Sequence, residues 1–170
     1  CISDIDTRHL TKILRDEGCK IGAIYPTKNF TDEEAKFEIE NFGSIEDQDF
    51  TENVSIKESY SFGKPKNKKT FKIVAIDFGI KENILRILQR MGGDIEVVPP
   101  SICAEEIQNM KPDGIFLSNG PGDPQVLVKP IKEVKKMMQL DIPIFGICLG
   151  HQIMSLAYDL EIEKMPFGHH

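Results

Sequence analysis

The sequence lacks any apolar run approaching the roughly 18 residues that a membrane-spanning helix needs, and it has no signal peptide. It also lacks a C-x-x-C pair, so its four cysteines indicate reduced thiols in a cytoplasmic protein and no metal framework. Basic residues are not in excess, since 21 Lys and Arg stand against 27 Asp and Glu, for a net charge of −6. We therefore expect neither a nucleic-acid nor a membrane partner.

Two kinds of ligand motif are missing as well. The sequence contains no Gly-x-x-x-x-Gly-Lys-Ser/Thr phosphate loop and no Gly-x-Gly-x-x-Gly dinucleotide fingerprint. Its acidic residues show no metal-ligand spacing. The sequence therefore predicts no bound cofactor and no metal in this chain.

What is present indicates a folded protein, because 40% of the 170 residues are hydrophobic. The chain opens on Cys1 and not on Met, so we expect a piece of something longer. For residues 1–62 the sequence predicts a partial α+β segment. One helix should begin after Asp6 and another at a Thr31–Glu34 capping box. The basic stretch 63–70, which contains Gly and Pro, is typical of an interdomain linker.

Residues 71–170 alternate between apolar runs and helical patterns. Strands are predicted at Phe71–Asp77, Ile95–Val98, Gly114–Ser118 and Ile142–Ile147. Continuously apolar strands separated by helices predict an open, mostly parallel α/β sheet with helices on both faces. Ligands bind such sheets beyond the carboxyl ends of the strands. The two most informative motifs of the chain lie at such ends.

The first motif places Cys148 in the stretch Phe145–Gln152, FGICLGHQ, where an apolar run ends and a helical pattern begins. Gly146 and Gly150 leave room for a sharp strand-to-helix turn, a nucleophile elbow. The helix that opens at Leu149 directs its amides toward the sulfur and favours the nucleophilic thiolate. A buried, inert cysteine is the alternative, but it explains neither glycine.

The second motif is the loop SNGPGDP, from Ser118 to Pro124. Its glycines and prolines fix a rigid turn whose backbone amides can face a ligand. A hydrolase that acts through Cys148 needs such amides to stabilise the oxyanion of its tetrahedral intermediate. One donor would be the amide of Leu149 and the other would come from this loop. An ordinary tight turn is the alternative when the loop is considered alone.

Together these motifs resemble the class I, or triad, glutamine amidotransferases, and more narrowly the small, glutamine-hydrolysing subunits of carbamoyl-phosphate synthetases. The elbow at 146–152 is shared by many members of the class, whereas the loop at 118–124 is more discriminating. Asp77–Arg86, DFGIKENILR, and Ser3–Arg8, SDIDTR, also resemble the small subunits. The resemblance covers essentially the whole chain.

The resemblance implies a reaction and a set of residues. Cys148 would attack the side-chain amide of glutamine, release ammonia and form a glutamyl thioester that water hydrolyses. The oxyanion amides would be those of Gly120 and Leu149. Glutamine would be bound by Gly120, Gly122, Leu149 and Gln152. No residue of this chain would bind a metal or a cofactor.

The resemblance also implies a fold and a partner. Residues 71–170 would form a flavodoxin-like glutamine amidotransferase domain, incomplete at its C-terminus, and residues 1–62 the C-terminal part of a smaller N-terminal domain. The partner would be the large synthetase subunit, which receives the ammonia through a tunnel in a cytoplasmic heterodimer and itself uses ATP and bicarbonate. The product would serve arginine biosynthesis, pyrimidine biosynthesis or both.

The histidines raise an alternative. In the family, a His-x-Glu motif far downstream of the elbow activates the cysteine, and these 170 residues do not contain it. His9, His151, His169 and His170 are the candidates for a base, and the family role of His151 is structural. We therefore expect an incomplete triad and little activity of this chain alone. A non-catalytic docking or scaffold role, or another cysteine hydrolase activity on the same fold, are the alternatives.

Overall fold

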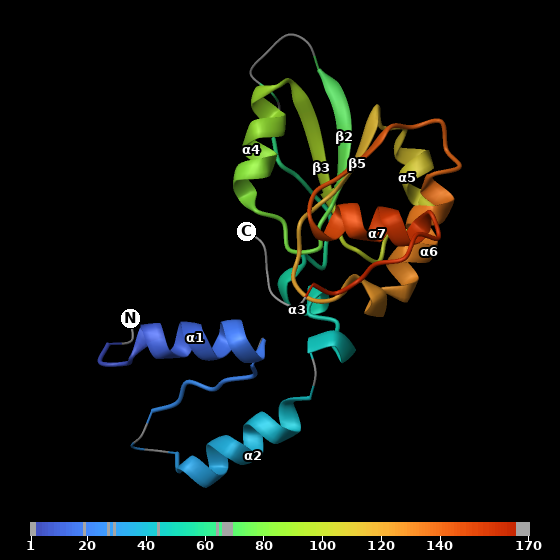
Figure 1. Cartoon of the computed structure of the whole chain (residues 1–170). Helices are drawn as coiled ribbons and strands as arrows, with labels where there is room; N and C mark the ends of the chain where they lie inside the picture. The colour runs from blue at the N-terminus through green and yellow to red at the C-terminus, as the bar shows by residue number, and fades with distance from the viewer. Residues whose placement is uncertain are drawn as a thin grey trace. The chain divides into compact units, whose positions relative to one another are not determined.

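The computed structural model shows two compact units, which comprise Cys1–Gly43 with Glu163–His170, and Ser44–Ile162 (Figure 1). The residues described are 3–18, 20–26, 28, 30–43, 45–63, 65 and 70–165.

The described part of the smaller unit forms the helices α1 (Thr7–Glu17) and α2 (Asp32–Phe42). The Asp6 side chain accepts the backbone N–H of His9 at 2.9 Å and caps α1. Thr31 and Glu34 form a reciprocal capping box at the start of α2. Both predicted helix starts are therefore confirmed, and each depends on a side chain that satisfies a free amide of the first turn.

The larger unit is built on a sheet whose order, within the described residues, is β1-β3-β2-β4-β5. Strands β2 to β5 pair in parallel, whereas the short β1 is antiparallel to β3 at one edge. The strands are Tyr60–Ser61 (β1), Phe71–Ile76 (β2), Gly93–Val98 (β3), Gly114–Leu117 (β4) and Ile144–Gly146 (β5). The predicted open, mostly parallel α/β sheet is confirmed.

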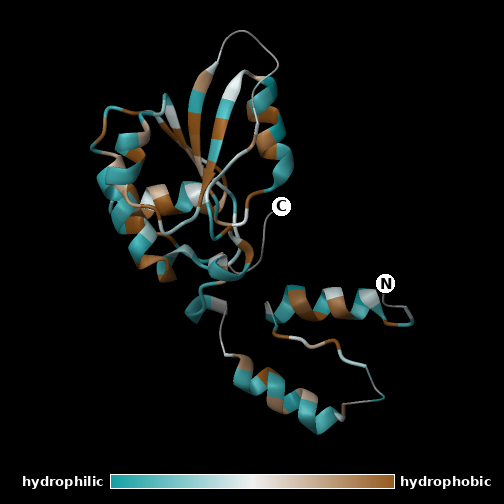
Figure 2. Cartoon of the chain, turned by 180° about the vertical axis from the view of Figure 1, so that it is seen from behind, coloured by the Kyte–Doolittle hydropathy of each residue, from teal (hydrophilic) through white to brown (hydrophobic). Residues whose placement is uncertain are grey.

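Helices cover both faces of this sheet (Figure 1). They are α4 (Glu82–Arg90) on one face and α5 (Ala104–Met110), α6 (Val128–Met137) and α7 (Leu149–Ala157) on the other. The described residues also form α3 (Thr51–Val54) and the 3-10 turns η1 (Ile45–Asp47) and η2 (Pro124–Val126). Along β2, Val74 and Ile76 enter the core beneath α5, α6 and α7, whereas Ile73 and Ala75 enter the core beneath α4. This alternation explains why β2 is apolar throughout. The helices are striped with hydrophobic and hydrophilic residues (Figure 2).

The strand order locates the expected ligand-binding edge. The chain passes from β2 to β3 on one side, and then crosses to β4 on the other side of β2. The strand order therefore reverses between β2 and β4, which is the topological switch point of an open α/β sheet. The loops after these two strands begin at Asp77 and Ser118.

The segment 56–62 contacts the sheet and its core. Tyr60 of β1 pairs with Val97 of β3, and the backbone N–H of Phe62 donates to the Ile95 carbonyl at 2.9 Å. Ile56 and Phe62 also pack on the core beneath α4. The contacts thus divide the chain near residue 43, well before the predicted linker at 63–70, of which residues 64 and 66–69 lie outside the described residues. That residues 1–62 belong to a separate N-terminal domain remains a prediction.

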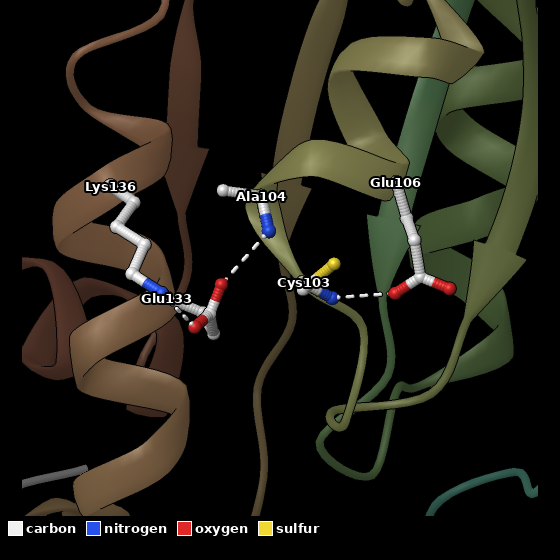
Figure 3. Close-up of polar contacts among 5 residues, drawn as sticks. All are labelled: Cys103, Ala104, Glu106, Glu133 and Lys136. Carbon is white, nitrogen blue, oxygen red and sulfur yellow. Dashed lines mark hydrogen bonds and ion pairs between the residues drawn. The ribbon is translucent and has the colours of Figure 1, made fainter.

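Polar contacts join α5 to α6 (Figure 3). The Glu133 carboxylate on α6 accepts the backbone N–H of Ala104, the first residue of α5, at 2.9 Å and the Lys136 ammonium at 2.6 Å. The bond from Lys136, followed by that from Ala104, lowers the pKa of Glu133 below its usual value. The Glu106 carboxylate accepts the backbone N–H of Cys103 at 2.9 Å, which lowers the pKa of Glu106. Two carboxylates therefore accept backbone N–H groups at the start of α5, which have no acceptor within the helix.

Candidate active site

Cys148 lies between the end of β5 and the start of α7, so the predicted strand-to-helix turn is present. Its backbone has a φ of 51° and a ψ of −112°, and its side chain is exposed. A positive φ is uncommon for a residue with a β-carbon, and such strain persists only where the surrounding structure enforces it. The turn therefore presents the thiol outward at the carboxyl edge of the sheet.

The two glycines around Cys148 are required by close packing. A β-carbon on Gly146 would lie 2.6 Å from the carbonyl carbon of Gly150 and 2.7 Å from the backbone nitrogen of His151. A β-carbon on Gly150 would overlap the carbonyl oxygen of Leu117. Strand β5, strand β4 and the start of α7 therefore approach one another too closely for any side chain at these two positions.

Backbone hydrogen bonds fix the turn. The N–H of Ile147 donates to the Leu117 carbonyl at 3.1 Å, and that of Gly150 donates to the Ser118 carbonyl at 3.0 Å. The Leu149 amide occupies the first position of α7, where it has no acceptor within the helix. It is therefore a suitable donor for a negatively charged oxygen beside the sulfur.

The loop after β4 lies against the start of α7. A β-carbon on Gly120 would be 2.6 Å from Cδ2 of Leu149 and would overlap the Phe78 carbonyl oxygen. Gly122 has a φ of 85°, and a β-carbon added there would lie 3.3 Å from the Phe50 ring. The loop thus brings Gly120 to the residue that follows Cys148.

The loops after β2 and β4 are bound to each other through a buried hydroxyl and an amide. The Ser118 hydroxyl accepts the Phe78 N–H at 2.8 Å and donates to the Asn119 carbonyl at 2.8 Å. The Asn119 side chain accepts the Lys81 N–H at 3.0 Å and donates to the Gly79 carbonyl at 3.0 Å. Asn119 and Asp77 belong to stretches that carry the family resemblance, but the sequence predicts no role for either residue.

Asp77 is almost completely buried, with 3% of its surface exposed. Its Oδ1 accepts the backbone N–H groups of Gly79 and Ile80 at 2.8 Å and 2.7 Å, and its Oδ2 accepts that of Ile56 at 3.0 Å. A carboxylate with three such donors replaces the hydration that it loses on burial. It fixes a turn directly beside the loop of Gly120.

The other predicted site residues lie on α7, in the smaller unit or outside the described residues. Gln152 is half-buried on α7, and its N–H donates to the Cys148 carbonyl at 3.0 Å. His151 is exposed at the start of α7, and its carbonyl accepts the Ser155 hydroxyl at 3.1 Å. His9 belongs to the smaller unit. His169 and His170 lie outside the described residues, as do Cys1 and Cys19.

A cavity of about 280 Å³ elsewhere in the larger unit does not include the candidate site. It lies among Asp49–Lys57, Pro99–Ser101 and Val126–Pro130, and none of the predicted glutamine-binding residues lines it.

Within the described ranges, no group of three or more His, Cys, Asp or Glu side chains is arranged to hold a metal ion. None of the helices in that part of the chain has the length and the apolar character that crossing a bilayer requires.

The class of the protein follows from comparison with known families. The family described as glutamine amidotransferase class-I matches residues 74–170, which include both motifs. The chain belongs to the class I glutamine amidotransferases.

The chain is also similar to particular proteins. Carbamoyl phosphate synthase small chains from Haemophilus ducreyi, Neisseria gonorrhoeae and Escherichia coli K12 are 44%, 44% and 42% identical to it over 99% of this chain. The matches cover 49%, 48% and 48% of those proteins, so the chain spans about half the length of the curated relatives it matches. A solved structure of a putative GMP synthase subunit from Thermoplasma acidophilum is 28% identical, with a TM-score of 0.47, over 54% of this chain and 47% of that one.

Proposed function

We propose that this chain is part of the glutaminase subunit of a carbamoyl-phosphate synthetase, and that Cys148 is its nucleophile. The observation that carries the proposal is the contact between the strained turn of Cys148 and the loop of Gly120, where a β-carbon would be 2.6 Å from the Leu149 side chain. Membership of the class I glutamine amidotransferases and the names of the relatives support it.

The reaction proceeds in two steps. The sulfur of Cys148 attacks the carboxamide carbon of glutamine, and the carbonyl oxygen becomes an oxyanion that the amides of Gly120 and Leu149 stabilise. The C–N bond then breaks, the nitrogen takes up a proton and leaves as ammonia, and a glutamyl thioester remains. Water attacks this thioester, which releases glutamate and restores the thiol. Gly122 and Gln152 help to hold the glutamine during both steps.

Proton transfer in these steps needs a histidine oriented by a carboxylate. We assign this role to the His-x-Glu pair that the family carries downstream of its elbow, and we assign His151 a structural role. The ammonia passes to a large synthetase subunit in the cytoplasm, where ATP and bicarbonate are used. This chain itself binds neither cofactor nor metal in the proposed scheme.

The proposal is tested by covalent labelling of the 170-residue chain. A chloromethyl ketone analogue of glutamine is added, and the modified position is identified by mass spectrometry, with Cys148→Ser as the control. We expect selective labelling of Cys148 over Cys1, Cys19 and Cys103, slowed by added glutamine. Labelling of all four cysteines at similar rates, without protection by glutamine, would contradict a formed glutamine site. It would favour the docking or scaffold role instead.

A second measurement separates glutaminase activity from another cysteine hydrolase activity. A protein of the relatives' full length is assayed for ammonia release from glutamine, both by itself and with a large synthetase subunit. We expect release that is lost in Cys148→Ser. Failure to release ammonia from glutamine, with Cys148 still labelled by the ketone, would indicate a hydrolase with a different substrate.

A further inference from the structure

Residues that precede the family-matched region contact the two loops of the candidate site. Cγ2 of Val54 is 2.9 Å from the position that a β-carbon on Gly79 would take, and the Phe50 ring is 3.3 Å from the corresponding position on Gly122. Both glycines have positive φ values, 119° and 85°. The segment 50–56 therefore packs directly against the backbone of Gly79 and Gly122, because these two residues have no side chain that would lie between.

Asp77, which follows strand β2, connects this segment to the sheet through hydrogen bonds. One oxygen of its carboxylate holds the turn after β2 through Gly79 and Ile80, and the other accepts the N–H of Ile56 at 3.0 Å. Since Asp77 is 3% exposed, water cannot readily replace any of these bonds. The position of the turn consequently depends on the position of the segment 50–56.

The turn transmits its position to the loop after β4. The Gly79 carbonyl accepts the Asn119 side-chain amide at 3.0 Å, and a β-carbon on Gly79 would lie 3.5 Å from Cα of Gly120. Gly120 in turn is enclosed between Phe78 and Leu149. A displacement of the turn would therefore shift the Gly120 amide relative to the first turn of α7.

We propose that Asp77 is a positioning residue that sets the Gly120 amide for the oxyanion by connecting the segment 50–56 to the turn after β2. This inference rests on the proposed glutaminase function. It makes the geometry of the site depend on residues outside the region 74–170 that the family shares.

Asp77→Asn is the discriminating variant. Asparagine keeps one carbonyl oxygen, which can still accept the N–H groups of Gly79 and Ile80, but its NH₂ group cannot accept the N–H of Ile56. Asp113→Asn is the matched control, because the Asp113 carboxylate accepts the backbone N–H of Lys72 at 2.7 Å near the opposite end of β2.

Two reagents on the full 170-residue chain provide the readout. A chloromethyl ketone analogue of glutamine passes through a tetrahedral adduct whose oxyanion needs the amides of Gly120 and Leu149 before the Cys148 sulfur displaces chloride. Iodoacetamide alkylates the same sulfur by direct displacement of iodide and forms no oxyanion. We expect Asp77→Asn to slow labelling at saturating ketone by about 10- to 100-fold, with little change in the iodoacetamide rate. Asp113→Asn should change neither rate.

The outcomes separate the two hypotheses. An unchanged ratio of ketone to iodoacetamide rates in Asp77→Asn, or an equal fall in both rates, would overturn the positioning role alone. Absence of glutamine-protected labelling in the unsubstituted chain would overturn the glutaminase proposal and this inference with it. If Asp77→Asn does not fold, Asn119→Ala tests the next step of the connection, since it removes the bonds to Gly79 and Lys81 and leaves Asp77 in place. The same fall in the ratio is expected, and an unchanged ratio would overturn the transmission from the turn to Gly120 on which the positioning role depends.

Discussion

The backbone N–H of Gly150 donates a hydrogen bond to the Ser118 carbonyl at 3.0 Å. This bond joins the turn that carries Cys148 to the loop that contains Gly120, and both segments leave the sheet from adjacent strands, β5 and β4. Backbone atoms, and not flexible side chains, therefore set the spacing between the candidate nucleophile and the candidate oxyanion loop. Preorganised donors of this kind need no rearrangement during the reaction.

Gly150→Ala should disrupt this junction. The added β-carbon would overlap the backbone of Leu117, so we expect a loss of at least about 2 kcal/mol in the free energy of unfolding, measured by urea denaturation. Gly114→Ala is the control, because its β-carbon would meet no atom closer than the Pro143 carbonyl oxygen at 3.7 Å. Similar losses in the two variants would show that the close approach at Gly150 is not rigid.

The strain at Cys148 predicts a reversal of the usual order of alanine and glycine. With a φ of 51° and a ψ of −112°, Cys148→Gly should be more stable than Cys148→Ala by about 1 kcal/mol, because relief of strain exceeds the entropy cost of glycine. At Ser155, within α7, glycine should be less stable than alanine by about 1 kcal/mol. Thermal unfolding of the four variants measures both differences, and the same sign at both positions would contradict strain at Cys148.

Local features of the candidate site could be predicted from the sequence. The need for Gly146 follows from its spacing from Cys148, since the atoms that it would clash with, in Gly150 and His151, belong to the same turn. The helix caps at Asp6 and Thr31 were predictable for the same reason, because each partner is three residues away. The parallel sheet follows from continuous apolar strands.

The supporting contacts could not be predicted in this way. Asp77 accepts the N–H of Ile56 21 residues earlier in the chain, and Asn119 contacts Gly79 40 residues earlier. In both cases one partner is a backbone group, the N–H of Ile56 or the carbonyl of Gly79. Such groups occur at nearly every residue and therefore leave no trace in the sequence. Strand β1, at Tyr60–Ser61, is too short to show an alternating pattern.

Ser118→Ala tests the buried link between the loops. Ser118 is fully buried, and its hydroxyl accepts the Phe78 N–H, so alanine leaves a buried donor without a partner. We expect a loss of about 1–3 kcal/mol in unfolding free energy and slower labelling of Cys148 by the glutamine ketone. Ser155→Ala is the control, since the Ser155 hydroxyl donates to the His151 carbonyl on the surface of α7 and should cost less than about 0.5 kcal/mol. Equal costs at the two positions would contradict the structural role of the buried hydroxyl.

The contact between α5 and α6 predicts a pH dependence of stability. The bonds from Lys136 and Ala104 lower the pKa of Glu133 in the folded chain, so the ionised carboxylate stabilises the fold. This contribution is present above the usual glutamate pKa of about 4.3 and is lost as the pH falls through the lowered, folded value. Glu133→Gln should therefore reduce the unfolding free energy by about 1 kcal/mol at pH 7.

The same variant should cost progressively less in acid. Urea denaturation of Glu133→Gln and of the unsubstituted chain, from about pH 7 downward through the usual glutamate pKa of about 4.3, measures the difference. The difference should shrink as the pH falls below that value, because protonation of the carboxyl removes the contribution of its charge. Glu105→Gln is the matched control, since Glu105 is an exposed carboxylate in the first turn of α5. We expect a smaller cost there. If the cost of Glu133→Gln were independent of pH, the carboxylate would act through its shape and not through its charge, and the connection between α5 and α6 would not be electrostatic.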